Sequence, residues 1–184
     1  MELNQIKSVI LSCVQSQTFC RVKFRYEYSE KYLLPLLCGG ECFVSAEESD
    51  FALDGYVIHA LCDVEDVKTA ENGFASKALR GGTFEYPIVP PLNPETMADC
   101  VASLRTMNTV SLIECSQSSS DMPVFLMGKI VNSGPVGCVL CPLSISGQWS
   151  RIPEQIGYGE IRRISFGKKS QELYSKLLPS CPLK

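Results

Sequence analysis

Cys138 and Cys141 are separated by two residues, and no other spacing in this sequence is so often linked to chemistry. Cys-x-x-Cys serves as a redox pair or as half of a zinc site. The pair lies in an apolar run after Gly137 that predicts a strand, in which positions i and i+3 point to opposite faces. A zinc site would need Cys38 and Cys42 as its other half. We interpret Cys138 and Cys141 as core residues. A zinc site of all four cysteines or a dithiol redox pair are the alternatives.

The chain contains ten cysteines, which in a secreted protein would suggest five disulfides. The N-terminus has Glu2 and no basic region before a short apolar core, so the sequence predicts no signal peptide. Most of the cysteines have apolar neighbours, and a free thiol packs as a small hydrophobe. We therefore expect reduced, buried thiols in a cytoplasmic protein.

The sequence offers little for an enzyme mechanism. His59 is the only histidine, and no glycine-framed serine accompanies it as a nucleophile. We interpret His59 as a strand residue whose ring is hydrogen-bonded. The carboxylates are scattered along the chain, and the Gly-x-Gly at Gly157 and Gly159 has no phosphate-binding loop around it. We predict a protein that is not an enzyme and has no cofactor.

Four cations near the C-terminus form the densest basic cluster. They are Arg162, Arg163, Lys168 and Lys169, and the last two precede the final helix, whose N-terminus would favour an anion. They are candidates for binding phosphate, RNA or an acidic partner, although solvated charges at a helix start would look the same. Trp149 is the lone tryptophan. If exposed it would be a stacking or interface residue, and if buried it would close the core.

Charge and hydropathy exclude some classes of protein. The net charge is −3, which argues against a general nucleic-acid binder. Residues 1–80 have 8 Lys and Arg against 12 Asp and Glu, whereas residues 93–184 have 9 against 7, so an anion site belongs to the second half. No apolar run approaches the ~18 residues of a membrane helix. We expect no membrane contact.

The expected helices and strands occur in the same order twice. Apolar residues at helical spacing predict a helix over 3–14, and Asn93-Pro94-Glu95 predicts the start of a second, because Asn caps well and Pro suits the first helical position. Apolar runs and alternations predict the strands 19–27, 32–38, 42–46, 55–61 and 64–69, then 109–114, 124–131, 137–143, a piece near 150–153, and 160–166. A short helix closes each half, over about 75–80 and around 173–178.

The two halves also repeat in sequence. Asp63–Val67 leads to a glycine and Ser-Lys-x-Leu, and Glu160–Ile164 does the same. We predict a first repeat over 1–80, a linker over 81–92 and a second repeat over 93–184. Phe84, Tyr86 and Ile88 make the linker apolar, so we expect it to pack against a repeat. Five short strands in so few residues bury their faces most economically as a small closed barrel.

The order of a helix and five strands resembles the Sm-like fold, which is close to the SH3-like barrels. Leu126–Val131, Cys138–Leu143 and Ile161–Gly167 are also similar to a group of bacterial proteins of unassigned function. Asp54–Ile58 and Asp63–Val67 match the same pattern in the first half. The resemblance implies a mainly β (α+β) fold of two tandem five-stranded SH3/Sm-like barrels with short flanking helices. Sm-type RNA binders use an Asp…Asn pair and an Arg/Lys-Gly, and neither lies at a matching position here.

The leading hypothesis is a non-enzymatic interaction or scaffolding module that binds a protein partner or itself. Exposed apolar groups around Trp149 or at Phe84–Tyr86 would support it. The first alternative is an RNA- or anion-binding protein that uses the basic cluster of the second repeat. The second is a zinc or thiol-redox protein.

Overall fold

A computed structural model of the chain describes residues 1–49, 52–70, 73–83, 85–117 and 120–183. The first half begins with helix α1, whose buried face carries Ile6 and Ile10. Strands and a second helix follow. The elements are α1 (Leu3–Ser16), β1 (Cys20–Phe24), β2 (Lys31–Cys38), β3 (Cys42–Ser49), β4 (Ala52–Leu53), β5 (Tyr56–Ala60), the 3₁₀ turn η1 (Leu61–Asp63), β6 (Val64–Thr69) and α2 (Phe74–Arg80).

The second half repeats this order without a counterpart of β4. Its helix α3 buries Val101 and Leu104, and its longest strand is β8. The elements are α3 (Met97–Met107), β7 (Val110–Gln117), β8 (Ser120–Ser133), β9 (Gly137–Pro142), β10 (Glu154–Gly157), the 3₁₀ turn η2 (Tyr158–Glu160), β11 (Ile161–Phe166) and α4 (Lys169–Leu177). Among the described residues no helix is both long and apolar enough to cross a bilayer.

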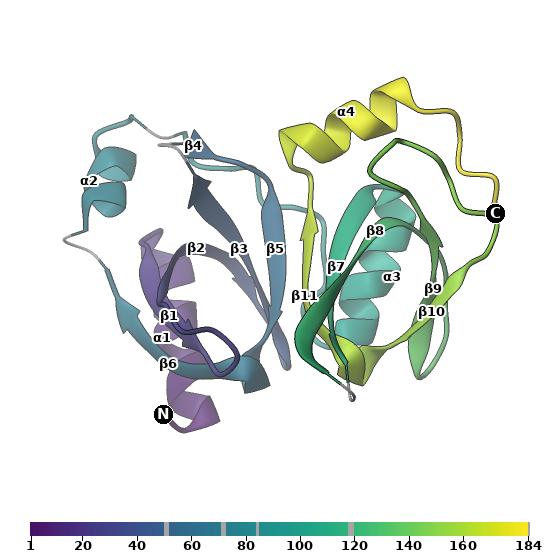
Figure 1. Cartoon of the computed structure of the whole chain (residues 1–184). Coiled ribbons are helices and arrows are strands. Elements are labelled where there is room, and N and C mark those ends of the chain that lie inside the picture. The colour runs from purple at the N-terminus through teal and green to yellow at the C-terminus, as the bar shows by residue number, and fades with distance from the viewer. Residues whose placement is uncertain (50–51, 71–72, 84, 118–119, 184) are drawn as a thin grey trace.

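All the strands belong to one antiparallel sheet of 11 strands. Its order is β10-β9-β8-β7-β11-β5-β3-β2-β1-β6, with β4 paired to β3. Figure 1 shows the two halves side by side, with β5 and β11 adjacent where they meet. The order of strands within each half is the same, because β5-β3-β2-β1-β6 corresponds to β10-β9-β8-β7-β11.

The expectation of closed barrels is wrong, because the sheet is open. The 3₁₀ turns η1 and η2 separate the fourth and fifth strands of each half, so that these two strands do not pair with each other. β5 pairs with β11 of the other half instead, and β6 and β10 end the sheet. An antiparallel sheet that lacks closure keeps two free edges.

The hydrophobic core extends across both halves. The largest buried cluster joins Val44 and Ile58 of the first half to Leu104, Ile113 and Ile164 of the second. A second cluster lies under α1 within the first half. Full burial of an aliphatic side chain stabilises the fold by roughly 1.5–3 kcal/mol. The shared cluster therefore stabilises the contact between the two halves.

Three local expectations need correction. α3 begins at Met97 with Thr96 as its N-cap, and not at Asn93. The backbone around Pro94 is engaged elsewhere, because its carbonyl accepts a hydrogen bond from the Cys42 amide. The strand expected near 150–153 lies at Glu154–Gly157. In the linker, Tyr86 packs against a core cluster of the first half as expected, but Ile88 is exposed, and Phe84 lies outside the described residues.

Candidate functional site

The two halves are joined by a strand pairing that runs through the middle of the sheet. β5 and β11 pair antiparallel, with Ile58 opposite Ile164 and Val57 opposite Ser165. Both isoleucines are fully buried. The joint is thus an edge-to-edge contact of two strands, sealed by apolar side chains on one face.

An ion-pair network covers the other face of this joint. The Arg163 guanidinium donates from Nη1 to Glu27 Oε1 at 2.9 Å, and its Nε lies 2.5 Å from Glu114 Oε2. Lys31 Nζ lies 3.4 Å from Glu27 and 3.4 Å from Glu47. Burial alone would lower the pKa of Arg163, but the carboxylates of Glu114 and Glu27 raise it above its ordinary value. Arg163 is therefore a structural cation that links β11 to the first half.

The other three predicted cations do not gather around Arg163. Arg162 lies over the Tyr26 ring, with its guanidinium carbon 5.0 Å from the ring centroid. Lys168 Nζ lies 3.7 Å from Glu47. Lys169 is exposed, and its backbone amide donates to Asp54 at 3.0 Å. Three of the four cations thus contact a carboxylate or a ring, and the four do not form one free patch.

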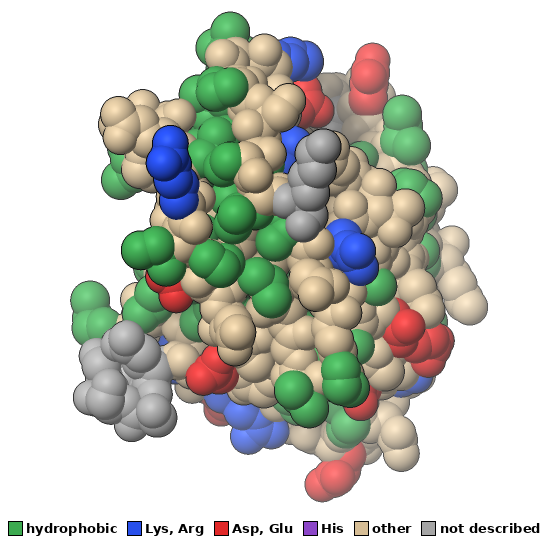
Figure 2. All heavy atoms as spheres, turned by 90° about the vertical axis from the view of Figure 1, so that its right-hand side faces the viewer, with side chains coloured by type: hydrophobic (Ala, Val, Ile, Leu, Met, Phe, Trp, Pro, Cys, Tyr) green, Lys and Arg blue, Asp and Glu red, His purple; other side chains and the backbone are tan. Residues whose placement is uncertain are grey.

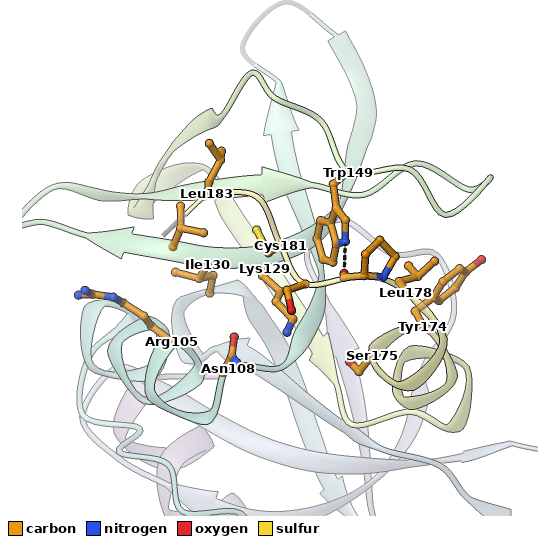
Figure 3. Close-up of a pocket in the computed structure, with 13 residues that line it drawn as sticks. Arg105, Asn108, Lys129, Ile130, Trp149, Tyr174, Ser175, Leu178, Cys181 and Leu183 are labelled. Carbon is orange, nitrogen blue, oxygen red and sulfur yellow. Dashed lines mark hydrogen bonds between the residues drawn. The ribbon is translucent and has the colours of Figure 1, made fainter.

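Trp149 is half-buried under the C-terminal tail. Its indole Nε1 donates to the Pro179 carbonyl at 2.8 Å, and it forms an isolated bridge with Leu143. It lines a hollow of about 370 Å³ together with Lys129 and Tyr174, as Figure 3 shows. Trp149 fits neither sequence interpretation in full, because it is neither a free stacking surface nor a fully buried core residue.

The four cysteines of the zinc hypothesis do not come together as one metal site among the described residues. Cys138 belongs to the shared core, whereas the Cys141 thiol donates to the Ser150 carbonyl at 3.5 Å. Cys42 is buried and Cys38 is half-buried. Within the described part of the chain, no three His, Cys, Asp or Glu side chains are grouped as metal ligands.

His59 is buried in the first half, between two aromatic rings. Its ring centroid lies 4.9 Å from that of Phe24 and 4.8 Å from that of Phe43. Nε2 is 3.1 Å from Ser45 Oγ, while Nδ1 has no hydrogen-bond partner among the described residues. Burial, assisted by the nearby Arg163 and Lys31, lowers the pKa of His59 well below its ordinary value. His59 is a neutral core residue, and only one of its two nitrogens is hydrogen-bonded.

The free edges of the sheet are the feature that the residue patterns did not indicate. β10 pairs with β9 and β6 pairs with β1, and neither has a second partner strand among the described residues. The Met1 amino group donates to the Glu65 carbonyl of β6 at 3.0 Å. Figure 2 faces the β9–β10 side, where hydrophobic side chains are spread over the surface and charged ones are scattered between them. Ile152 and Ile145 are the exposed aliphatic residues nearest to β10 in the sequence.

The sequence repeat was the signal that could have identified these edges. Asp63–Val67 aligns with Glu160–Ile164, so β6 is the counterpart of β11 and β10 is the counterpart of β5. The two halves are joined by β5 and β11, and the two free edges, β10 and β6, are the counterparts of these same strands. No family model, curated protein or solved structure matched this chain.

Proposed function

We propose that this chain is a non-enzymatic interaction module that assembles with further copies of itself through strand pairing. In this assembly β10 of one copy pairs with β6 of the next. One observation carries the proposal: the chain already pairs β5 with β11, the counterparts of these two free strands. An exposed edge offers unpaired amide and carbonyl groups to another strand.

The internal joint also suggests a register for the contact between copies. Val57 lies opposite Ser165 in the joint, and their counterparts are Glu154 on β10 and Lys68 on β6. A Lys–Glu pair directly across two antiparallel strands is favourable, by roughly 0.2–1 kcal/mol. The Met1–Glu65 hydrogen bond lies outside this register, because Glu65 is the counterpart of Arg162, which is not paired with β5.

The proposal includes an account of the fold. Residues 1–80 and 93–184 are two copies of one five-stranded unit of the SH3/Sm-like type, each left open, with residues 81–92 as the linker. The identical strand order and the aligned segments support this duplication. An open unit that shares its edge with a neighbour satisfies the same backbone groups that closure would satisfy.

The alternative interpretation is that both edges are built to prevent pairing with another chain. β10 has only four residues, and β6 carries Glu65, Asp66 and Lys68, which is how many proteins prevent edge pairing. The two readings predict different behaviour with concentration. If the chain self-associates, its weight-average mass rises with protein concentration. If the edges prevent pairing, the chain stays a monomer at every concentration.

Sedimentation velocity over a series from about 1 µM to 1 mM, the range of weak association, tests the proposal. Glu154→Lys and Lys68→Glu each place like charges in the contact, and we expect each to weaken association about tenfold. The double variant restores an opposite pair within every contact and regains association. Lys77→Glu, an exposed site on α2, is the matched control and behaves as the wild type. A wild-type chain that stays monomeric, or single variants that assemble unchanged, would contradict the proposal.

A further inference from the structure

The C-terminal tail is held against the loop that precedes β10. Beyond the Trp149–Pro179 hydrogen bond, the Tyr174 hydroxyl donates to the Ile145 carbonyl at 3.4 Å. The Leu178 side chain packs directly on Gly147, where a Cβ atom would lie 2.9 Å from Leu178 Cδ2. Figure 3 shows the tail crossing the hollow. The tail is thus fixed by a few contacts and no regular secondary structure beyond α4.

Two cysteines meet where the tail crosses the sheet. Cys141 is buried on β9, opposite Lys129 of β8, and Cys181 lies on the tail and lines the same hollow as Lys129. Burial, followed by the neighbouring Cys181 thiol, raises the pKa of Cys141 to about 12. The charged side chains that line the described part of the hollow are Arg105 and Lys129.

This pair differs from two other thiol pairs of the chain. The Cys13 thiol of α1 raises the pKa of Cys20, and the Cys42 thiol of the first half raises the pKa of Cys100 in the second. All four of those side chains are at most 1% exposed. Cys181 is only half-buried and lies on a tail segment. Reaction with an external thiol reagent requires access, so Cys141–Cys181 is the pair that can react while the protein stays folded.

We propose that Cys141 and Cys181 form a thiol–disulfide modification site that locks the C-terminal tail onto β9. The oxidant is a small disulfide of the glutathione class. The Cys181 thiolate attacks one of its sulfurs, the oxidant's S–S bond breaks, and the first leaving thiolate takes up the proton that Cys181 lost. The Cys141 thiolate then attacks the Cys181 sulfur and releases the second thiol. The two protein thiols lose two electrons and two protons, and the oxidant becomes two thiols.

The consequence is a covalent link in place of a few hydrogen bonds. In the reduced chain the tail can detach from the loop Ser144–Arg151, whereas the disulfide holds it there. Because β10 begins at Glu154, three positions after Arg151, the lock would also hold the start of β10 in place. The disulfide itself does not depend on the assembly proposed above, and it is measured without reference to it.

The test treats the full-length folded protein with oxidised glutathione at mildly alkaline pH, because the thiolate is the nucleophile. Limited trypsin digestion then cleaves after the exposed Lys176 and separates the segment that contains Cys181. In the reduced protein this segment is released. After oxidation we expect it to remain attached, with the loss of two hydrogen atoms, until a reductant is added. The single tryptophan, Trp149, reports the tail by its fluorescence.

Two variants keep the test specific. Cys181→Ser removes the link, and we expect complete release of the segment under oxidising conditions. Cys62→Ser removes an exposed thiol elsewhere and leaves the link unchanged. Release of the segment from the oxidised wild type, or peptide mapping that finds Cys181 only as a mixed disulfide with glutathione, would overturn the proposal.

Discussion

At the scale of single residues, His59 makes the stability of the fold depend on pH. Its pKa is lowered in the folded protein, so below pH 6.5 the unfolded chain takes up a proton that the folded chain does not. The free energy of unfolding should therefore fall by about 1.4 kcal/mol per pH unit below 6.5, down to the folded pKa, and this contribution is fully present above 6.5.

The matched variant for this prediction is Ser45→Ala/His59→Phe, in which a ring still fills the space between Phe24 and Phe43 and no hydroxyl loses its partner. Urea denaturation of both proteins over the pH unit below 6.5 checks it. The difference in their free energies of unfolding should change with the stated slope. Parallel pH curves would show that His59 carries a proton in the folded state.

Substitution of Arg163 tests how much the ion-pair network at the joint stabilises the fold. Arg163→Met leaves Glu114, whose side chain is 5% exposed, without its cation, and we expect a loss of about 3 kcal/mol in the free energy of unfolding. Arg162→Met, on the adjacent residue, removes a cation–π contact and a cation near Asp63, and should cost about 0.5–1 kcal/mol. Chemical denaturation measures both. Equal losses would mean that the network stabilises the joint no more than a surface contact does.

At the scale of elements, the N-cap of α3 stabilises the helix that packs against the shared core. Thr96 Oγ1 accepts a hydrogen bond from the Asp99 amide at 3.1 Å. Thr96→Ala should lower the free energy of unfolding by about 1 kcal/mol, because one amide at the helix start loses its partner. Thr106→Ala, at an exposed position on the same helix, should change it by less than about 0.5 kcal/mol. Thermal unfolding compares the two, and equal shifts in Tm would argue against capping by Thr96.

The sequence predicted most elements because their patterns are local. Periodicity located α1 and most of the strands, and β6 lies at the predicted 64–69. β10 was displaced in the prediction because Glu154–Gly157 shows no β-branched run and only one buried side chain, Ile156. The partner of Arg163 could not be read from the sequence, since Glu27 lies 136 positions away. The open sheet was missed for the same reason: no local pattern states which strand an edge will pair with.

At the scale of the whole molecule, the two free edges differ from each other, and this determines the kind of assembly. Pairing β10 with β6 is a head-to-tail contact, which closes into a ring or extends as a filament, whereas pairing of one of these edges with its own copy stops at a dimer. A mixture of Glu154→Lys and Lys68→Glu proteins separates these cases. In head-to-tail contacts, Lys at position 154 of one protein meets Glu at position 68 of the other, and the reverse contact is native.

Each variant alone should therefore be weakly associating, and an equimolar mixture should regain wild-type association with the two proteins alternating. Native mass spectrometry with one variant isotopically labelled reads both the size and the alternation. In pairing of like edges, β6 meets β6 or β10 meets β10. Mixing would then create an opposite-charge pair only between unlike chains and produce nothing larger than a dimer. Assemblies of more than two chains in strict alternation are the outcome that head-to-tail pairing requires, and a mixture that stops at dimers would exclude it.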